Sequence, residues 1–273
     1  MTSDAATVLA DAHVHFHACF DTSAFFAAAE RNFDSAARQL GRSVDSHGCL
    51  LFTESAWDHH FRTFRDEVRE MPPGWSFAQT DEAESVLALH AGKPALLMIA
   101  GRQIVTADGL EVLALGTDRE FADGEETRAA LEAVRDSGAL AVLPWGFGKW
   151  WFRRGRLVRE ILADSGNGAF FLGDNGGRPR LSVTPRVLRE GRRRGFRVLP
   201  GSDPLPFARQ VSTVGSRGFA FDCRLDPARP ARSIRQALGD RACGLESFGH
   251  GDGIAAFIRD QLAMQWVKRQ RTS

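Results

Sequence analysis

The chain has 273 residues, 43% of them hydrophobic, and a formal net charge of +1. This apolar content can bury a core in one large domain or two small ones, and the near-zero charge excludes a global field that attracts nucleic acid or membranes. No stretch has the about 18 uninterrupted apolar residues of a transmembrane helix, and no signal peptide is recognisable. The four cysteines form no CxxC pair, which argues against a structural zinc site of that type; no disulfide framework is indicated, and a reducing, cytoplasmic location is expected.

Strand and helix signals alternate in the first part of the chain. A buried strand is predicted over residues 7–13, and a helix capped by Asp21 and Thr22 follows, with phenylalanines and alanines at helical spacing as far as about residue 40. A second apolar strand covers residues 49–53, a helix is expected over 57–70, and a Pro-Pro-Gly run then breaks the chain.

Residues 75–116 have a different pattern. Short β-like segments are separated by turn signals, the clearest of which is Asp108-Gly109 between two apolar runs. An Asp-Gly pair in that context is a strong hairpin signal. We therefore expect a hairpin-rich insertion over 75–116.

Alternation of strands and helices resumes after residue 116. Helices of 10 to 14 residues between short apolar strands are typical of parallel βα units. The expected helices cover 125–137, 155–164, 184–194, 230–238 and 253–269, and the expected strands cover 140–143, 169–172, 197–199 and 217–223. These signals predict one α/β domain over residues 1–273, in which 217–273 is a C-terminal extension.

The first predicted strand ends in the motif Asp11-Ala-His13-Val-His15-Phe-His17. Residues two apart on a strand point to the same side, so His13 and His15 can chelate one divalent cation together. Strand C-termini are also where the active sites of β/α barrels form. The alternative is that these histidines pack or hydrogen-bond in a purely structural role.

A second candidate group, Gly201-Ser202-Asp203, follows one of the last predicted strands. A sharp turn there would expose Asp203 at the same end of the sheet as His13 and His15. Its carboxylate could bind the metal or act as a general base toward a metal-bound water. The alternative is a turn residue or a helix cap.

These motifs, in this order, resemble those of the polymerase-and-histidinol-phosphatase (PHP) family. The resemblance also rests on the segments Leu51-Phe-Thr53-Glu54, Ala100-Gly-Arg102-Gln103-Ile and 109–116, and it covers roughly residues 7 to 210. It implies a distorted TIM-like β/α barrel of about seven strands. It also implies up to three divalent metals at the strand C-termini and hydrolysis of phosphate esters.

The family pattern is only partly kept. His13, His15 and Asp203 match it, whereas other expected ligands are replaced. Ser55, beside Glu54, occupies the position of a family histidine, and Gln103 occupies that of a bridging glutamate. Glu111 replaces a histidine on the hairpin strand, and Trp145 replaces a histidine after a middle strand. The resemblance therefore implies a divergent member with a reduced site: one metal on His13, His15 and Asp203, with Glu54 as a further ligand or catalytic base beside Asp203.

Several residues near the predicted strand ends are candidates for substrate binding. The segment from Trp145 to Arg156 mixes aromatic and basic side chains, which suit a flat group and a phosphate respectively. The candidates are Lys149, Trp145, Asn175, Arg178 and Arg102. A packed lid with a solvated basic edge, and a polar turn around Asn175, are the alternatives.

The sequence thus favours a metal-dependent hydrolase with one Zn, Mn or Fe ion, acting as a phosphoesterase on a phosphorylated small molecule. A non-catalytic PHP-like binding or scaffold protein without metal is the first alternative. An amidohydrolase-like barrel enzyme is the second, because it shares a first-strand His-x-His and a last-strand aspartate. No membrane or nucleic-acid partner is expected, and the oligomeric state is not indicated.

Overall fold

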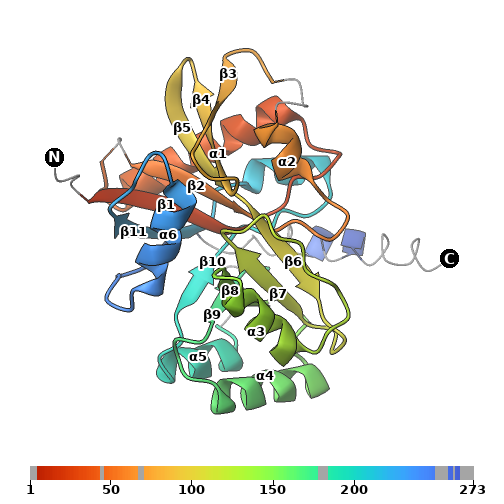
Figure 1. Ribbon diagram of the computed structural model, residues 1–273. Coiled ribbons are helices and arrows are strands. Elements are labelled where there is room, and N and C mark those ends of the chain that lie inside the picture. Colours follow the sequence, from red (N-terminus) through yellow and green to blue (C-terminus); the bar gives the residue numbers. More distant parts are fainter. Residues whose placement is uncertain are drawn as a thin grey trace.

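Two β-sheets with helices packed around them make up the structure, a computed structural model (Figure 1). It describes residues 5–43, 46–66, 71–177, 184–249, 258–260 and 262–264. Within these residues the chain is a mixed α/β protein, as the alternation of strand and helix signals predicts.

The first sheet holds the strand that carries the histidine motif. Its order is β12-β11-β1-β2-β5-β4-β3, with β1 parallel to β2, β2 parallel to β5, and β11 antiparallel to β1. The strands are β1 (Ala6–Val14), β2 (His47–Phe52), β3 (Trp75–Gln79), β4 (Ser85–His90), β5 (Lys93–Ile99), β11 (Gly218–Cys223) and β12 (Glu246–Phe248). Since β1 is flanked on both sides, the motif at its end is held from two directions.

The second sheet has the order β10-β9-β8-β7-β6 and ends at the strand that precedes Asp203. Strands β8, β9 and β10 are parallel, whereas β6 and β7 form an antiparallel hairpin whose second strand pairs antiparallel with β8. The strands are β6 (Gly101–Val105), β7 (Glu111–Leu115), β8 (Leu140–Trp145), β9 (Phe171–Asp174) and β10 (Val198–Pro200). The hairpin predicted from Asp108-Gly109 is confirmed, with Gly109 at a positive φ of 72°.

Each helix buries apolar side chains, and some also have a local start signal. In the longest, α1, the Asp21 side chain accepts a hydrogen bond from Ala24 N, which confirms the predicted cap. The helices are α1 (Thr22–Gln39), α2 (His60–Arg65), α3 (Thr127–Asp136), α4 (Phe152–Asp164), α5 (Arg186–Arg193) and α6 (Pro230–Gly239), with a 3-10 helix η1 (Ala208–Thr213). Helix α2 begins later than expected, so Trp57 lies outside it in a turn.

Buried aromatic side chains hold the first sheet to α1 and α2. Phe16, Phe25, Phe26, Phe52 and Phe64 belong to one cluster of buried residues and meet mostly edge to face. Such contacts add to the hydrophobic gain of burying the rings. The cluster fixes the end of β1 beside β2, and therefore holds in place the segment that carries the histidines.

The two sheets meet along two seams. At one, Glu54 after β2 forms a parallel bridge with Arg102 of β6. At the other, Asp203 N after β10 donates to His13 O at the end of β1, at 2.8 Å. The ladders of the described residues thus form two sheets, in which the edge strands β10 and β6 of the second sheet meet the ends of the inner strands β1 and β2 of the first; they do not form one closed barrel.

The region expected as an insertion is divided between both sheets. Of residues 75–116, β3 to β5 extend the first sheet at the top of Figure 1, and β6 and β7 open the second. Strand β11, in the expected C-terminal extension, pairs along β1. Most of the helix expected over 253–269 lies outside the described residues.

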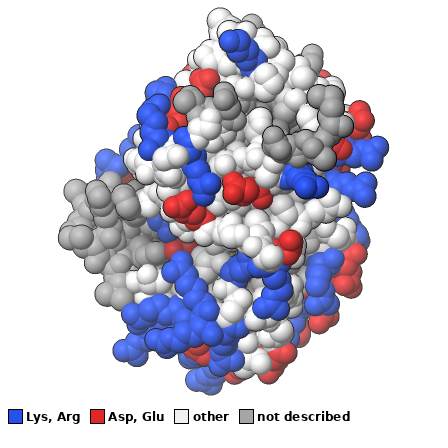
Figure 2. Space-filling model, turned by 90° about the vertical axis from the view of Figure 1, so that its left-hand side faces the viewer, with Lys and Arg blue, Asp and Glu red and all other residues white. Residues whose placement is uncertain are grey.

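Charge is unevenly distributed although the net charge is close to zero. Figure 2 shows lysine and arginine side chains gathered over the lower part of the molecule, where Figure 1 places α4 and α5. The helices that the structure describes are all too short or too polar to cross a membrane.

Candidate metal centre

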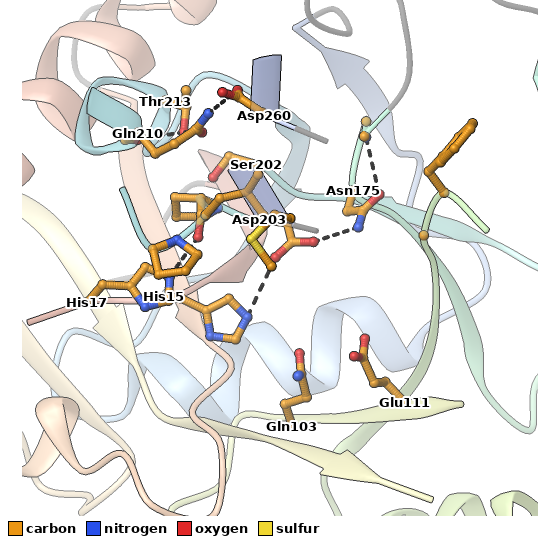
Figure 3. A pocket seen from close by; sticks show the side chains of 18 of the residues that line it. His15, His17, Gln103, Glu111, Asn175, Ser202, Asp203, Gln210, Thr213 and Asp260 are labelled. Atoms are coloured by element: carbon orange, nitrogen blue, oxygen red, sulfur yellow. Dashed lines mark hydrogen bonds and ion pairs between the residues drawn. The ribbon is translucent and has the colours of Figure 1, made fainter. Parts of the chain in front are cut away.

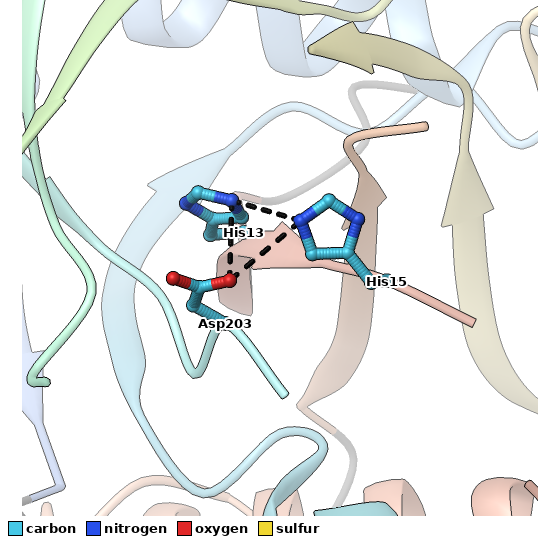
Figure 4. A group of neighbouring side chains, drawn as sticks. All are labelled: His13, His15 and Asp203. Carbon is cyan, nitrogen blue, oxygen red and sulfur yellow. Dashed lines mark hydrogen bonds and ion pairs between the residues drawn. The ribbon is translucent and has the colours of Figure 1, made fainter. Parts of the chain in front are cut away.

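Three side chains from the ends of β1 and β10 converge on one point (Figure 4). His13 Nε2 and His15 Nε2 lie 3.1 Å apart, and Asp203 Oδ1 lies 3.5 Å from the first and 3.6 Å from the second. In the described part of the chain this is the one group of three or more His, Cys, Asp and Glu side chains with metal-ligand spacing. The structure therefore brings together the three residues that both motifs supplied.

The spacing of these three atoms fits a tetrahedral cation. Ligands about 2.0–2.1 Å from a Zn²⁺ ion lie about 3.3 Å from one another at the corners of a tetrahedron. The three measured distances, 3.1, 3.5 and 3.6 Å, bracket that value.

The surroundings of His13 Nε2 also suit a cation. Gln103 Oε1 lies 3.2 Å from this nitrogen, in addition to the His15 and Asp203 atoms. Two oxygen acceptors, Asp203 Oδ1 and Gln103 Oε1, converge on this nitrogen, and one ring N–H cannot donate a full hydrogen bond to both. A cation bound at this point would satisfy both oxygens, so the donor set fits a divalent metal.

Asp11 links the segment that carries His13 to the loop that carries Asp203. Its carboxylate accepts hydrogen bonds from Ser202 N at 2.8 Å, Ser202 Oγ at 2.5 Å, Gly215 N at 2.9 Å and His13 N at 3.2 Å. Burial raises the pKa of Asp11 to about 6, although these donors favour its charged form. Asp11 therefore fixes the loop that carries Asp203 against the strand that carries His13.

The approach of that loop to β1 requires glycine at position 201. A Cβ on Gly201 would lie 2.4 Å from His13 N and 2.5 Å from His13 Cβ. Asp203 itself has a positive φ of 46°, a conformation that costs a non-glycine residue energy and clusters at functional sites. Close packing and strain together turn the Asp203 carboxylate toward the histidines.

Electrostatics keep His15 and Asp203 in the protonation states that metal binding needs. Burial lowers the pKa of His15 to about 3, and nearby His13 lowers it as well. For Asp203, burial acts to raise the pKa, but His13, His15, Lys149 and the Asn175 hydrogen bond outweigh it and hold the pKa at about 2. A neutral imidazole and a charged carboxylate are the ligand forms of these residues.

The group opens into a pocket of about 730 Å³ (Figure 3). Asn175 Nδ2 donates to Asp203 Oδ2 at 2.6 Å, so the second carboxylate oxygen is held from the pocket side. Lys149 lines the same pocket and forms an ion pair with Glu111. Lys149 and Asn175, both predicted substrate contacts, thus lie beside Asp203.

Glu54 and Arg102 lie outside the group formed by His13, His15 and Asp203. Both are buried, and Glu54 accepts hydrogen bonds from Phe61 N at 2.6 Å and from Arg102 Nη1 at 3.2 Å. Arg102 Nη2 also donates to Asp118 at 3.0 Å. Neither Glu54 nor Arg102 lines the pocket, and Glu54 is not part of the three-residue group. A buried guanidinium needs an anionic partner, and this need explains why Glu54 turns away from the histidines.

Trp145 and Arg178 were the remaining substrate candidates. Trp145 is buried in the core under the second sheet, among the residues of α3 and α4, and does not line the pocket. Arg178 lies outside the described residues.

The Glu54–Arg102 pair yields a prediction for pH dependence. Burial raises the pKa of Glu54 from 4.5 to about 7, against the opposing effects of Phe61 N–H and Arg102. The folded state holds the Glu54 proton more tightly than the unfolded chain, so the contribution of Glu54 to the unfolding free energy is greatest below pH 4.5. This contribution, about 3 kcal/mol, is lost as the pH rises through about 7.

Urea unfolding of the wild type and of Glu54→Gln between pH 4.5 and 8 measures this contribution. We expect the difference in unfolding free energy between the two proteins to change across that window. Glu132→Gln, at an exposed site on α3, is the matched control and should follow the wild type. Parallel profiles for wild type and Glu54→Gln would contradict the expectation.

Two aromatic residues at the pocket are not named among the substrate-binding candidates, although Phe147 lies within the predicted aromatic-basic segment from Trp145 to Arg156. Trp57, in the turn after β2, and Phe147, after β8, both line the pocket. Each follows the C-terminal end of a strand, which is where α/β sites collect their side chains. A position just after a strand end is therefore the sequence signal for both residues. The helix predicted over 57–70 includes Trp57, and the predicted substrate contact in the second loop is Trp145 instead of Phe147.

Comparison with known proteins finds similarity at the level of structure. No protein-family model and no curated protein sequence matches the chain. The crystal structure of PsfC from Pseudomonas syringae PB-5123 matches with a TM-score of 0.54 and 15% identity, over 98% of this chain and 100% of that one. At this identity, the likeness shows a shared fold and nothing about activity.

Two further solved structures are more distant. One is a two-domain protein from Bacteroides vulgatus containing a predicted PHP-like metal-dependent phosphoesterase (TM-score 0.49, 18% identity, 90% of this chain and 66% of that one). The other is the lesion-specific endonuclease PfuEndoQ from Pyrococcus furiosus (TM-score 0.47, 12% identity, 88% and 57%).

Proposed function

We propose that this protein is a metal-dependent hydrolase with a mononuclear site, and that it cleaves a phosphate ester of a small molecule. The observation that carries the proposal is the convergence of His13, His15 and Asp203, with ligand atoms 3.1 to 3.6 Å apart, at a pocket of about 730 Å³. Zn²⁺, Mn²⁺ and Fe ions all accept two imidazoles and a carboxylate.

The residues of the pocket have different roles in this proposal. A divalent cation held by the three ligands supplies Lewis acidity toward a phosphoryl oxygen and toward water. Asn175 holds Asp203 in its orientation through the 2.6 Å hydrogen bond. Lys149, placed by Glu111, offers a cation to a second anionic oxygen of the substrate. Glu54 stays with Arg102 and has no part in this mechanism.

One ion is proposed because the pocket has few other anionic ligands. The glutamate and histidines that would hold further ions in the PHP pattern are Gln103, Glu111 and Trp145 in this chain. Gln103 is neutral, Glu111 is neutralised by Lys149, and Trp145 is buried. A cluster of cations would lack the negative charge that it needs.

We also propose that the fold is a distorted, PHP-like barrel. The two seams support this, because Glu54 with Arg102 joins the end of β2 to β6, and Asp203 with His13 joins the end of β1 to the loop after β10. The described cysteines are all free thiols, which supports a reducing, cytoplasmic location.

Metal analysis tests the proposed function. Protein purified without chelator should carry about one equivalent of metal, and Asp203→Ala should weaken metal affinity by at least about 100-fold because one of three ligands is lost. Asp222→Ala, which removes an exposed carboxylate from β11, is the control and should keep its metal.

A phosphatase screen with the metal-loaded protein then tests activity. Hydrolysis of phosphomonoesters by the wild type, lost in Asp203→Ala, supports a phosphoesterase. Stoichiometric metal without hydrolysis favours the non-catalytic binding protein. A wild type that takes up no metal rejects the proposal.

A further inference from the structure

Trp57 is unusually exposed for a residue at a binding pocket. Its side chain is 88% exposed, and it lines the pocket from the turn between β2 and α2. In the described part of the chain its indole has no ring partner and no hydrogen bond. An exposed indole forgoes the large gain that burial of this side chain brings, so tryptophan in such a place is typical of a surface that is covered when a ligand binds.

A second aromatic ring reaches the same pocket from a different loop. Phe147, between β8 and α4, is 43% exposed and lines the pocket. Trp151 packs against it edge to face, with ring centroids 5.1 Å apart. A ring held by a packed neighbour loses less conformational entropy when a ligand binds.

The pocket has more room than an inorganic anion needs. Its volume of about 730 Å³ lies within the range of sites for drug-sized ligands. Polar side chains line much of the pocket, and those beside Asp203 include Asn175, which contacts it directly, and Lys149, whose charge acts on it. Trp57 and Phe147 contribute aromatic surface to the same lining. A ligand with an anionic end and an apolar, flat part matches the Asp203 group and these two rings.

We propose that the substrate is an aryl or heteroaryl phosphate ester, whose ring is bound by Trp57 and Phe147 while its anionic group lies at His13, His15 and Asp203. This inference rests on the proposed function, and it adds the class of leaving group. Trp57 and Phe147 are then specificity-determining residues. They favour flat rings over short alkyl groups because stacking and burial of the ring have no counterpart for a methyl group.

Binding of two non-hydrolysable probes tests the proposal. Phenylphosphonate and methylphosphonate share the anionic group and differ in the ring, so isothermal titration of the metal-loaded protein with each isolates the contribution of the ring. We expect phenylphosphonate to bind about 10-fold more tightly or better. Trp57→Ala and Phe147→Ala should each remove most of that preference and leave methylphosphonate binding unchanged.

Phe152→Ala is the matched control. Phe152 is even more exposed than Trp57, at 91%, and follows Trp151 in the chain, but it does not line the pocket. Its replacement should leave the preference for phenylphosphonate intact. The control separates a role in the pocket from a general effect of losing an exposed aromatic side chain.

Metal content measured on the same samples keeps the two proposals apart. Bound metal with equal affinity for both probes, or with no binding of either, overturns the proposed substrate class and leaves the proposed metal site standing. Absence of metal overturns the proposed function. A preference that survives in Trp57→Ala and Phe147→Ala also overturns the assignment of these residues.

Discussion

Replacing Gly201 with alanine should abolish tight metal binding although all three ligand side chains remain. The added Cβ would lie 2.4 Å from His13 N and 2.5 Å from His13 Cβ, so the loop after β10 has to move away from β1. Both neighbouring atoms belong to backbone or to Cβ and cannot rotate aside. Asp203 moves with the loop, and its carboxylate leaves the His13–His15 pair.

We expect metal affinity to fall by about 100-fold, as for other displaced ligands, and the unfolding free energy to fall by about 2–3 kcal/mol from overpacking. Equilibrium dialysis with Zn²⁺ and urea unfolding measure the two effects. Gly239→Ala, at a position with nothing within 4 Å of the new Cβ, controls for the change of glycine itself. Wild-type affinity in Gly201→Ala would falsify the proposed geometry.

The three ligand residues could be found from the sequence because they follow local rules. A His-x-His pair needs only strand alternation to converge, and Asp203 follows the C-terminal end of another strand, β10 of the second sheet. The cap at Asp21 and the hairpin at Asp108-Gly109 follow equally local rules. In each case one short segment contains all the information.

The orientation of Glu54 could not be found in this way. It depends on Arg102, which is 48 residues away and needs a buried counter-charge. Trp145 is similar, since it packs under the second sheet among residues of α3 and α4. The exposed position of Trp57 depends on where α2 begins, and helix ends are the least certain part of any pattern-based assignment.

Asp11 belongs to the His-x-His motif segment, but its role depends on residues that are distant in the sequence. It was noted as a neighbour of the histidines, yet its partners are Ser202 and Gly215, 191 and 204 residues away. None of its contacts is to a ligand side chain. It acts on the metal site by holding the backbone of both ligand segments, a role comparable to the outer-sphere residues that orient metal ligands.

Asp11→Asn should therefore weaken metal binding without removing a ligand. One carboxylate oxygen accepts from His13 N and Ser202 N, and the other accepts from Gly215 N and Ser202 Oγ. Asparagine has a single acceptor oxygen, so in either orientation at least one backbone N–H faces an NH₂ group and is left unpaired. An unpaired buried N–H costs about 1–3 kcal/mol.

We expect Asp11→Asn to lower the unfolding free energy by about that amount and metal affinity by about 10- to 100-fold. The matched control is Asp108→Asn, because Asp108 likewise accepts from a backbone N–H and a hydroxyl, both of Thr127, at 2.9 Å. Both Thr127 donors reach one oxygen, Oδ2, which the asparagine carbonyl can replace, so Asp108→Asn should keep both its stability and its metal affinity. If Asp11→Asn lost stability without losing metal affinity, Asp11 would be a structural residue only.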